Sequence, residues 1–494
     1  ILGYQSDSLG TPHHILACSK HFVGDGGTTN GIDQGNTQVS EKKLREIHLP
    51  PYISNIDAGV GSVMASFSSW NGEKCHGSEY LLTDVLKEEL GFEGFVLSDW
   101  QGINQLDGDF SVAVKEAVNA GIDLAMQPYD YIQYTEVLHD LAGSGEVPME
   151  RIDDAVERIL RIKFQMGLFE NPYADMALAD TVGCEAHREV ARQAVRESIV
   201  LLKNDGMLPL SQSNGEVLVA GAKADDVGAM CGGWSISWQG SMGDITEGTT
   251  VYEAVRQKIG HDNTLFSQNP SQIPDADYAV VVVGEEPYAE GAGDVFPSQS
   301  KFTLSHEDQA MIDAVEEEGI PMVVVLLSGR PLDIRTPLNQ SNVFLAAWLP
   351  GTEGGKGIAD VIFGDYNPTG KLSHTWPESY DDVPINISGD YPGHDALFPF
   401  GYGLSYDEIG VGEQQTGPAF KAYPNPAAAF LIVQPEKAGK LSITLRDMTG
   451  SAVIHQTRQV RGREKLHIGH LAKGVYILEV NDGKGTTSRK IIRR

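Results

Sequence analysis

Short apolar runs alternate with amphipathic stretches through the first third of the chain. The apolar runs, which have the length of buried strands, lie at 15–22, 61–70, 94–100 and 122–127. Between and after them, apolar residues recur three and four positions apart, most regularly at 149–166, and this spacing predicts amphipathic helices. Strand–helix alternation favours a parallel sheet with crossover helices. Four such units are visible, whereas a closed (β/α)8 barrel has eight, so residues 1–175 are predicted to form a small open sheet or half of a barrel.

A second region of strand–helix alternation spans residues 176–404. Its apolar runs are continuous, as expected for strands buried on both faces, and they lie at 217–222, 278–284, 322–329 and 343–351. The pattern predicts a second α/β domain in which a sheet is sandwiched between helices. A turn-rich linker is predicted at 405–418, and residues 419–494 then show the period of two that is typical of a small antiparallel β-sandwich.

Charge separates the tail from the rest of the chain. The 494 residues carry 37 Lys and Arg against 68 Asp and Glu, a net charge of −31. Residues 420–494 hold 14 of the basic and 5 of the acidic residues, so this segment has a net charge of +9 and the preceding part has −40. The change of sign indicates a separate C-terminal module. The acidic balance argues against nucleic-acid binding, and the longest apolar runs are far shorter than the ~20 residues of a membrane-spanning helix.

Three side chains stand where predicted strands end. Asp99 closes the run at 94–100, and Lys20 and His21 close the run at 15–22. In α/β barrels this end of a strand faces the active site. Asp99 is therefore a candidate nucleophile, general base or metal ligand, and the two basic side chains are candidate partners for hydroxyl groups. The alternative for Asp99 is that it caps the following helix.

A metal site is not predicted. The close group His13, His14, Cys18 and His21 would place two side chains on each face of an extended strand, because side chains alternate between faces. The four cysteines lie far apart and form no CxxC pair, which excludes zinc-ribbon and redox motifs.

Two further groups occur in the second α/β region. Trp234 and Trp238, in CGGWSISWQG, suit stacking on the flat, weakly polar faces of sugars, or else packing at a domain interface. Glu285, Glu286 and Glu290 follow a buried strand, at the sheet edge where α/β proteins bind ligands. A carboxylic acid there is a candidate proton donor, and a solvated acidic loop is the alternative.

Seven stretches resemble one known family and occur in its order. They are KHFVGDGG, MASFSSWNG, GFVLSDWQGI, CGGWSISWQG, VVVGEEPYAEGAGD, LLSGRPL and AAWLPGTEGGKGIADVIFGDYNPTGKLSHTWP. Over about residues 10–406 the chain resembles the family 3 glycoside hydrolases, especially the β-glucosidases and exo-β-glucanases with a clamp of two tryptophans.

The resemblance implies a catalytic pair drawn from different predicted domains. Asp99, in SDW, matches the family's nucleophile, and Glu290, in GEEPYAE, matches its acid/base. Asp99 would attack the anomeric carbon while Glu290 protonates the departing oxygen, and water assisted by Glu290 would hydrolyse the glycosyl ester with retention of configuration. We therefore expect the pKa of Glu290 to be raised.

The resemblance also implies the contacts with substrate. Lys20 and His21 would bind sugar hydroxyls, Trp234 and Trp238 would form the clamp, and Trp100 would line the pocket beside the nucleophile. The two-carboxylate mechanism needs no metal and no organic cofactor.

The chain departs from the family pattern in several places. Phe67, Gln34 and Gln101 stand where close relatives often carry Tyr, Glu and Glu. The loop VGDGGTTNGIDQGN has no histidine, whereas the N-acetylglucosaminidase branch carries a His–Asp dyad there, so the glucosidase branch is favoured. The family's barrel begins well before KHF. We therefore expect the chain to hold only the second half of the barrel, as an N-terminally truncated part of a longer enzyme.

The tail resembles a second family. AYPNPAAAFLIV (422–433) and the basic end of the chain (474–494) resemble the C-terminal sorting domain of the type IX secretion system. This implies that residues 419–494 engage that machinery and that the protein is secreted or held at the cell surface of a Gram-negative bacterium. A carbohydrate-binding β-sandwich is the alternative.

Together these features predict hydrolysis of terminal non-reducing β-D-glucosyl residues from a β-glucoside or β-glucan oligosaccharide. Two alternatives stay open. One is an inactive sugar-binding fragment that lacks half the barrel, and the other is a glycoside phosphorylase on the same scaffold.

Overall fold

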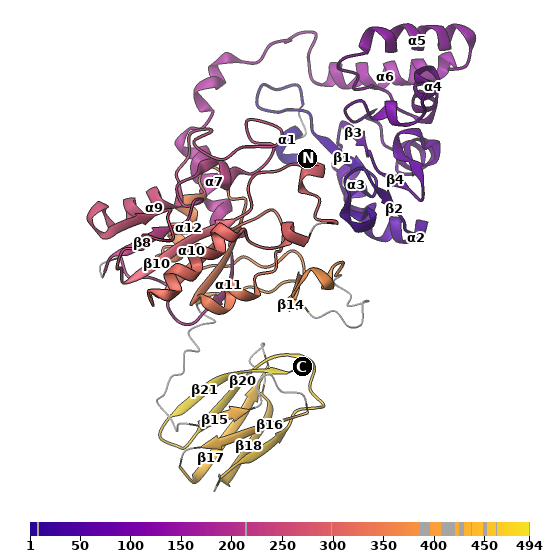
Figure 1. The fold of residues 1–494 in the computed structure, drawn as a ribbon. Helices are drawn as coiled ribbons and strands as arrows, with labels where there is room; N and C mark the ends of the chain where they lie inside the picture. The colour runs from indigo at the N-terminus through magenta and orange to yellow at the C-terminus, as the bar shows by residue number, and fades with distance from the viewer. Residues whose placement is uncertain are drawn as a thin grey trace. The chain divides into compact units, whose positions relative to one another are not determined.

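The computed structural model describes the chain except for residues 7–8, 213–214, 298, 386–395, 407–419, 424–428, 436, 448–451, 461 and 494. Helices and strands are mixed along it, which confirms the predicted α/β class (Figure 1). By its internal contacts the chain divides into two compact units. The first comprises Ile1–Val190, Gly232–Ser241 and Pro287–Thr303, and the second comprises the rest. Nearly all of the predicted linker at 405–418 and most of the YPNP stretch lie outside the described residues.

The first unit is built on three short parallel strands. Their order in the sheet is β1 (Cys18–Phe22), β3 (Ser62–Ala65) and β6 (Phe95–Leu97). β3 lies in the middle and is buried along its whole length. Because all three strands run the same way, their carboxyl ends meet at one edge of the sheet, and this edge carries the chemistry described below.

Helices pack around this sheet and fill one apolar core with it. They are α3 (Pro50–Asp57), the π-helix η5 (Tyr80–Glu89), α4 (Phe110–Ala120), α5 (Tyr131–Ser144) and α6 (Met149–Gln165). Local sequence signals set both ends of α4. The Asp109 carboxylate caps its first N–H groups, and Gly121, with a φ of 125°, ends it.

The predicted strand at 122–127 does not form a regular ladder. Only Leu124 pairs, through an isolated bridge to Leu97. The Asp123 carboxylate instead accepts the N–H of Val96 (2.7 Å), and the N–H of Met126 donates to a serine hydroxyl. Backbone bonds still hold this segment beside β6, because the N–H of Leu124 donates to the carbonyl of Val96 (3.1 Å) and the N–H of Ser98 donates to the carbonyl of Leu124 (3.0 Å). The strands among the described residues of this unit do not close into a barrel.

The second unit contains a six-stranded sheet. Its order is β7 (Val200–Asn204), β12 (Val343–Trp348), β11 (Met322–Leu327), β10 (Tyr278–Gly284), β8 (Val217–Ala220) and β9 (Thr264–Ser267). Every pairing is parallel except that of β7 with β12.

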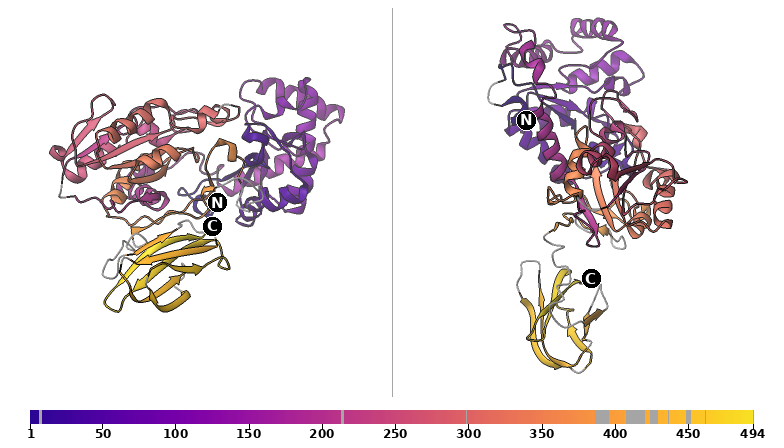
Figure 2. Two further views of the ribbon diagram at one scale, coloured as in Figure 1. Left: turned by 60° about the horizontal axis from the view of Figure 1, so that its bottom comes forward. Right: turned by 90° about the vertical axis from the view of Figure 1, so that its left-hand side faces the viewer.

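Both faces of this sheet are covered. Along β11, Val323 and Val325 join one apolar core, and Val324 and Leu326 join the other. The first core includes side chains of α9 (Val251–Ile259) and α12 (Gly354–Ile362), and the second includes those of α10 (His306–Glu317). Figure 2 shows the ribbon of the chain from two further sides. The continuous apolar runs are therefore strands buried on both faces, as predicted.

The tail consists of two antiparallel sheets. One has the order β15 (Phe420–Tyr423), β16 (Phe430–Pro435) and β19 (Glu464–His467). The other has the order β18 (Ala452–Val460), β17 (Gly439–Arg446), β20 (Gly474–Asn481) and β21 (Thr486–Arg493). Residues of both sheets, among them Leu431 and Ile443, share one apolar core.

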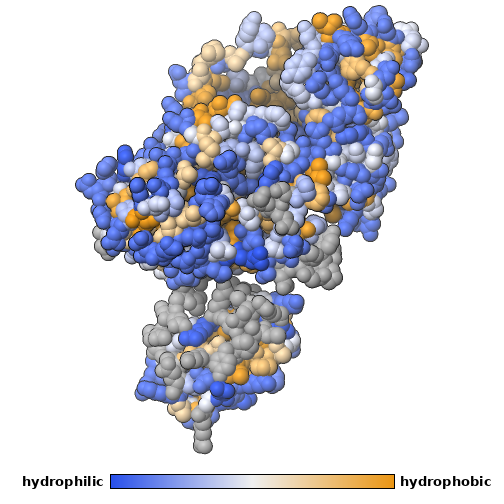
Figure 3. Space-filling view, viewed as in Figure 1, coloured by the Kyte–Doolittle hydropathy of each residue, from blue (hydrophilic) through white to orange (hydrophobic). Residues whose placement is uncertain are grey.

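The surface is mainly hydrophilic, with apolar side chains exposed in scattered patches on the face shown in Figure 3. Within the described ranges, no helix is both long enough and apolar enough to cross a membrane.

Candidate active site

Asp99 lies two residues beyond the end of β6 and is held by four hydrogen bonds, one of them from the Ser98 hydroxyl to its carbonyl (2.9 Å). Its backbone N–H donates to Nε2 of His76 (2.9 Å), and its carbonyl accepts the N–H of Gly102 (3.0 Å). Its carboxylate Oδ1 accepts the backbone N–H of Trp100 (2.7 Å). The short helix η6 (Gly102–Gln105) has no side-chain cap, so Asp99 does not serve as its N-cap. With 17% of its side chain exposed, the carboxylate is fixed and still reachable.

His21 lies between two carboxylates at the end of β1. Its Nδ1 is 3.2 Å from Oδ2 of Asp25, and its Nε2 is 3.4 Å from Oδ2 of Asp99. The hydrogen bond from His21 is the main cause that lowers the pKa of Asp25. Lys20 precedes His21, and its Nζ lies 5.8 Å from the ring centroid of Trp234. The KHF stretch thus contacts both the Asp99 carboxylate and the tryptophan loop.

Glu290 opens the short helix η9 (Glu290–Gly293), in a loop whose contacts belong to the first unit. Three hydrogen bonds anchor this loop. The N–H of Ala289 donates to Oε1 of Gln239 (3.0 Å), and the Asp294 carboxylate accepts the N–H of Asp33 (3.1 Å). Lys301 Nζ donates to the carbonyl of Ala292 (2.8 Å).

The backbone of Glu290 is itself strained. Its φ is 52°, in the left-handed region that a residue with a Cβ adopts at a cost of roughly 1–3 kcal/mol. Such a conformation persists only where neighbouring contacts hold it, and the anchors on both sides of Glu290 supply them. The loop therefore holds this carboxyl in one place.

Burial and like charges act on the Glu290 carboxyl. Its pKa is raised, first by burial and then by the charges of Asp33 and Asp99. A hydrogen bond from Trp238 and the nearby His21 act in the opposite direction. The pKa shift has the direction expected of a proton donor.

Aromatic rings are exposed around these carboxyls. Trp234 and Trp238 have 66% and 54% of their surface exposed, and their ring centroids lie 6.5 Å apart with planes at 54°. The N–H of Trp234 donates to the carbonyl of Trp238, which closes the turn between them. Trp100 is also half exposed and meets Tyr129 edge to face. The rings offer apolar faces, and they are not packed into a core.

Several residues that complete the site were not predicted from the sequence. His76 and Gln239 bond the backbone at or beside the two carboxyls. Asp25 bonds His21, and the Asp294 carboxylate accepts the N–H of Asp33. A weak signal existed for Asp25, because it stands four residues after His21 beyond a strand end. The pairing of Asp33 with Asp294 joins positions 261 residues apart and has no local signal.

No group of three or more His, Cys, Asp or Glu side chains in the described part of the chain is arranged to hold a metal ion.

Comparison with known families covers most of the chain. Residues 1–162 match the Glycosyl hydrolase family 3 N terminal domain, and residues 199–406 match the Glycosyl hydrolase family 3 C-terminal domain. Residues 421–494 match a Secretion system C-terminal sorting domain.

Curated relatives include two β-glucosidases and a β-xylosidase. The chain is 31% identical to a periplasmic β-glucosidase of Salmonella typhimurium, over 94% of this chain and 68% of the relative. It is 34% identical to a lysosomal β-glucosidase of Dictyostelium discoideum (79% and 51%) and 31% identical to a β-xylosidase of Formosa agariphila (81% and 60%). The chain thus spans about half to two thirds of these relatives' length.

The chain is also similar to solved structures of glycoside hydrolases. A Q683A mutant of an exo-1,3/1,4-β-glucanase from a Pseudoalteromonas species is 40% identical, with a TM-score of 0.76 over 82% of this chain and 68% of that chain. A β-glucosidase from Listeria innocua shares the fold, with 22% identity and a TM-score of 0.71 over 100% of this chain and 77% of that chain.

Proposed function

This chain belongs to glycosyl hydrolase family 3, and we propose that it removes terminal non-reducing β-D-glucosyl residues from β-glucosides or β-glucans with retention of configuration. One observation carries the proposal. Asp99 and Glu290, from distant parts of the sequence, lie in one compact unit, and the charge of Asp99 helps to raise the pKa of Glu290.

The proposed chemistry divides the work between these carboxyls. Asp99 attacks the anomeric carbon as Glu290 gives its proton to the departing oxygen, and a glycosyl ester forms on Asp99. Glu290, now ionised, takes a proton from the water that hydrolyses this ester. The carboxylate of Asp99 is already oriented by the N–H of Trp100, so little reordering precedes attack.

Substrate binding is assigned to the surrounding side chains. Lys20 and His21 hold sugar hydroxyls beside Asp99. Trp234, Trp238 and Trp100 offer exposed ring faces for stacking against the sugar.

We also propose the finer domain architecture. β1, β3 and β6 belong to the second half of a (β/α)8 barrel within residues 1–175, and residues 176–404 form the second domain. The tail at 419–494, joined by the linker at 405–418, is a β-sandwich that directs type IX secretion to the medium or the surface of a Gram-negative cell. Its match to a sorting domain supports this.

The test is hydrolysis of p-nitrophenyl β-D-glucoside by the parent chain and by Asp99→Asn and Glu290→Gln. Asp140→Asn, whose side chain is 88% exposed on α5, is the matched control. We expect the parent and control to be active and the two site variants to lose at least about 10²-fold.

Other results would replace the proposal. Glucose binding without turnover identifies the inactive fragment, and cleavage that depends on phosphate identifies a phosphorylase. If the chain cleaves p-nitrophenyl β-D-xyloside faster than p-nitrophenyl β-D-glucoside, the proposal of a glucosyl substrate is overturned. For the tail, deletion of 420–494 should leave the protein in the periplasm, whereas lost binding to insoluble glucan with normal export supports a carbohydrate-binding module.

A further inference from the structure

His76 is a buried histidine that touches the backbone of the proposed nucleophile. It belongs to the short helix η4 (Cys75–Gly77) and has no exposed surface. Its Nε2 accepts the backbone N–H of Asp99 at 2.9 Å. The family resemblance in the sequence assigned no role to this residue.

The surroundings of His76 leave its ring little room to move. The Phe67 ring lies against it, with centroids 5.7 Å apart. On the other side, a Cβ at Gly102 would stand 2.4 Å from Nε2. The absence of a side chain at Gly102 is therefore what lets the imidazole reach the Asp99 peptide.

The hydrogen bond requires a neutral imidazole with its proton on Nδ1, because an imidazolium has no acceptor. Burial, followed by the charges of Lys74 and His21, lowers the pKa of His76 to about 4, against an opposing contribution from the Ser66 backbone. Above that pH the ring remains an acceptor, and its hydrogen bond to Asp99 persists.

We propose that His76 is a positioning residue that fixes the Asp99 peptide, and through it the carboxylate, for attack on the sugar. This inference rests on the proposed function, since it takes Asp99 as the nucleophile. The peptide group before the Asp99 Cα is held by His76, which accepts its N–H. The peptide group after it is held at the Asp99 carbonyl by the Gly102 N–H and the Ser98 hydroxyl. Loss of the first bond frees the Asp99 backbone to rotate, and a displacement of about 1 Å at a reacting group slows a reaction by up to ~10²-fold.

The test compares two substitutions of His76. His76→Gln keeps an amide oxygen that can accept the Asp99 N–H, and His76→Met fills the space without a comparable acceptor. Gly102→Ala is a second variant, which keeps the imidazole of His76 but displaces it from the N–H of Asp99.

The probe is 2,4-dinitrophenyl 2-deoxy-2-fluoro-β-D-glucoside. A bond forms between an Asp99 oxygen and the anomeric carbon as dinitrophenolate leaves, and the release of dinitrophenolate gives the labelling rate. We expect His76→Met and Gly102→Ala to label ~10- to 100-fold more slowly than the parent at saturating probe, and His76→Gln to recover most of the rate. The inhibition constant of glucose should change less than about threefold, because glucose binding needs no attack by Asp99.

The outcomes distinguish a failure of the positioning role of His76 from a failure of the proposed function. Labelling of His76→Met at the parental rate overturns the positioning role, and so does a loss of glucose binding in step with the rate, which indicates general disruption. A parent that is not labelled at Asp99 overturns the proposed function. In that event, the hydrogen-exchange rate of the Asp99 backbone amide tests whether His76 holds this amide. Faster exchange in His76→Met than in His76→Gln supports the hydrogen bond, and equal exchange in the two variants overturns it.

Discussion

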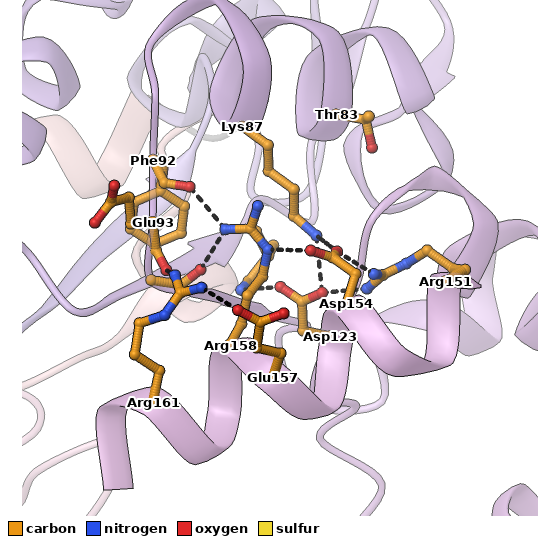
Figure 4. Close-up of polar contacts among 12 residues, drawn as sticks. Thr83, Lys87, Phe92, Glu93, Asp123, Arg151, Asp154, Glu157, Arg158 and Arg161 are labelled. Carbon is orange, nitrogen blue, oxygen red and sulfur yellow. Dashed lines mark hydrogen bonds and ion pairs between the residues drawn. The ribbon is translucent and has the colours of Figure 1, made fainter. Parts of the chain in front are cut away.

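The two ends of β6 handle charge in opposite ways. At its amino end, the basic side chains of Lys87, Arg151 and Arg158 surround two carboxylates (Figure 4). Asp123, whose side chain is fully buried, accepts Lys87 Nζ at 2.8 Å, the Arg151 guanidinium and a backbone N–H. Asp154 bonds the same two cations and Arg158, and Lys87 and Arg158 keep its pKa low despite burial.

The carboxyl end of β6 has an excess of negative charge. His21 lies between the carboxylates of Asp25 and Asp99, and the charges of Asp33 and Asp99 both act on Glu290. The raised pKa of Glu290 follows from this imbalance together with burial.

The charges at the two ends of β6 therefore have different effects. Paired charges at the amino end tie α6 to the strand, because Arg158 also bonds the carbonyls of Phe92 and Gly94. Unbalanced charge at the carboxyl end helps to raise the pKa of Glu290, which suits the proton donor that we propose. In parallel α/β folds, ligands and catalysis belong to the carboxyl ends of the strands, and the opposite face serves stability.

The largest effect is expected at Asp123. Asp123→Asn leaves Lys87 and Arg151 buried without their shared carboxylate, so the free energy of unfolding should fall by about 3–5 kcal/mol. Urea unfolding of the variant beside Asp140→Asn measures this. A change below about 1 kcal/mol would show that the amino end of β6 is not the stabilising end.

A smaller effect concerns pH and His76. The ring has a pKa of about 4 in the folded chain and an ordinary value of 6.5 when unfolded. Between these values the unfolded chain binds more protons, so the free energy of unfolding falls as pH is lowered from 6.5 towards 4, by up to about 3 kcal/mol. In His76→Gln this part of the pH dependence should vanish. Identical slopes in parent and variant would contradict the burial of a neutral ring.

A third prediction concerns the effect of the Asp33 charge on the pKa of Glu290. Its charge raises the pKa of Glu290, so Asp33→Asn should lower that pKa. The basic limb of the pH profile of kcat/KM, which reports the acid of the free enzyme, should then move to lower pH. The backbone N–H of Asp33 still reaches Asp294, so the loop anchor remains. A limb that stays in place or moves to higher pH refutes the role of Asp33.

The smallest effect is expected from an exposed pair beside the buried network. Glu157 and Arg161 lie one turn apart on α6, with 70% and 37% of their side chains exposed. Glu157→Gln should reduce the free energy of unfolding by no more than about 0.5 kcal/mol. A cost as large as that of Asp123→Asn would mean that burial is not what separates the strong contacts in Figure 4 from the weak ones.

Local pattern was enough for much of the fold. The helix expected at 149–166 is α6, which ends one residue earlier, and the strand expected at 278–284 is β10, with the same bounds. At 122–127 the pattern predicted a full strand, whereas the structure has a single bridge and a few backbone hydrogen bonds beside β6. The pattern also missed α5 and β7. The hydrophobic period reports which positions face the core, but it does not report which hydrogen bonds the polar positions will make.

By itself, the sequence determined the α/β class, the family and the residue types of the proposed pair, because these depend on local period and on ordered motifs. Only the tertiary structure brought the loops Gly232–Ser241 and Pro287–Thr303 into the compact unit that holds Asp99. It also set His76 against the Asp99 peptide and joined Asp33 to Asp294. Contacts between residues so far apart in the chain depend on how buried elements pack, and the period of a short segment carries no information about its distant partners.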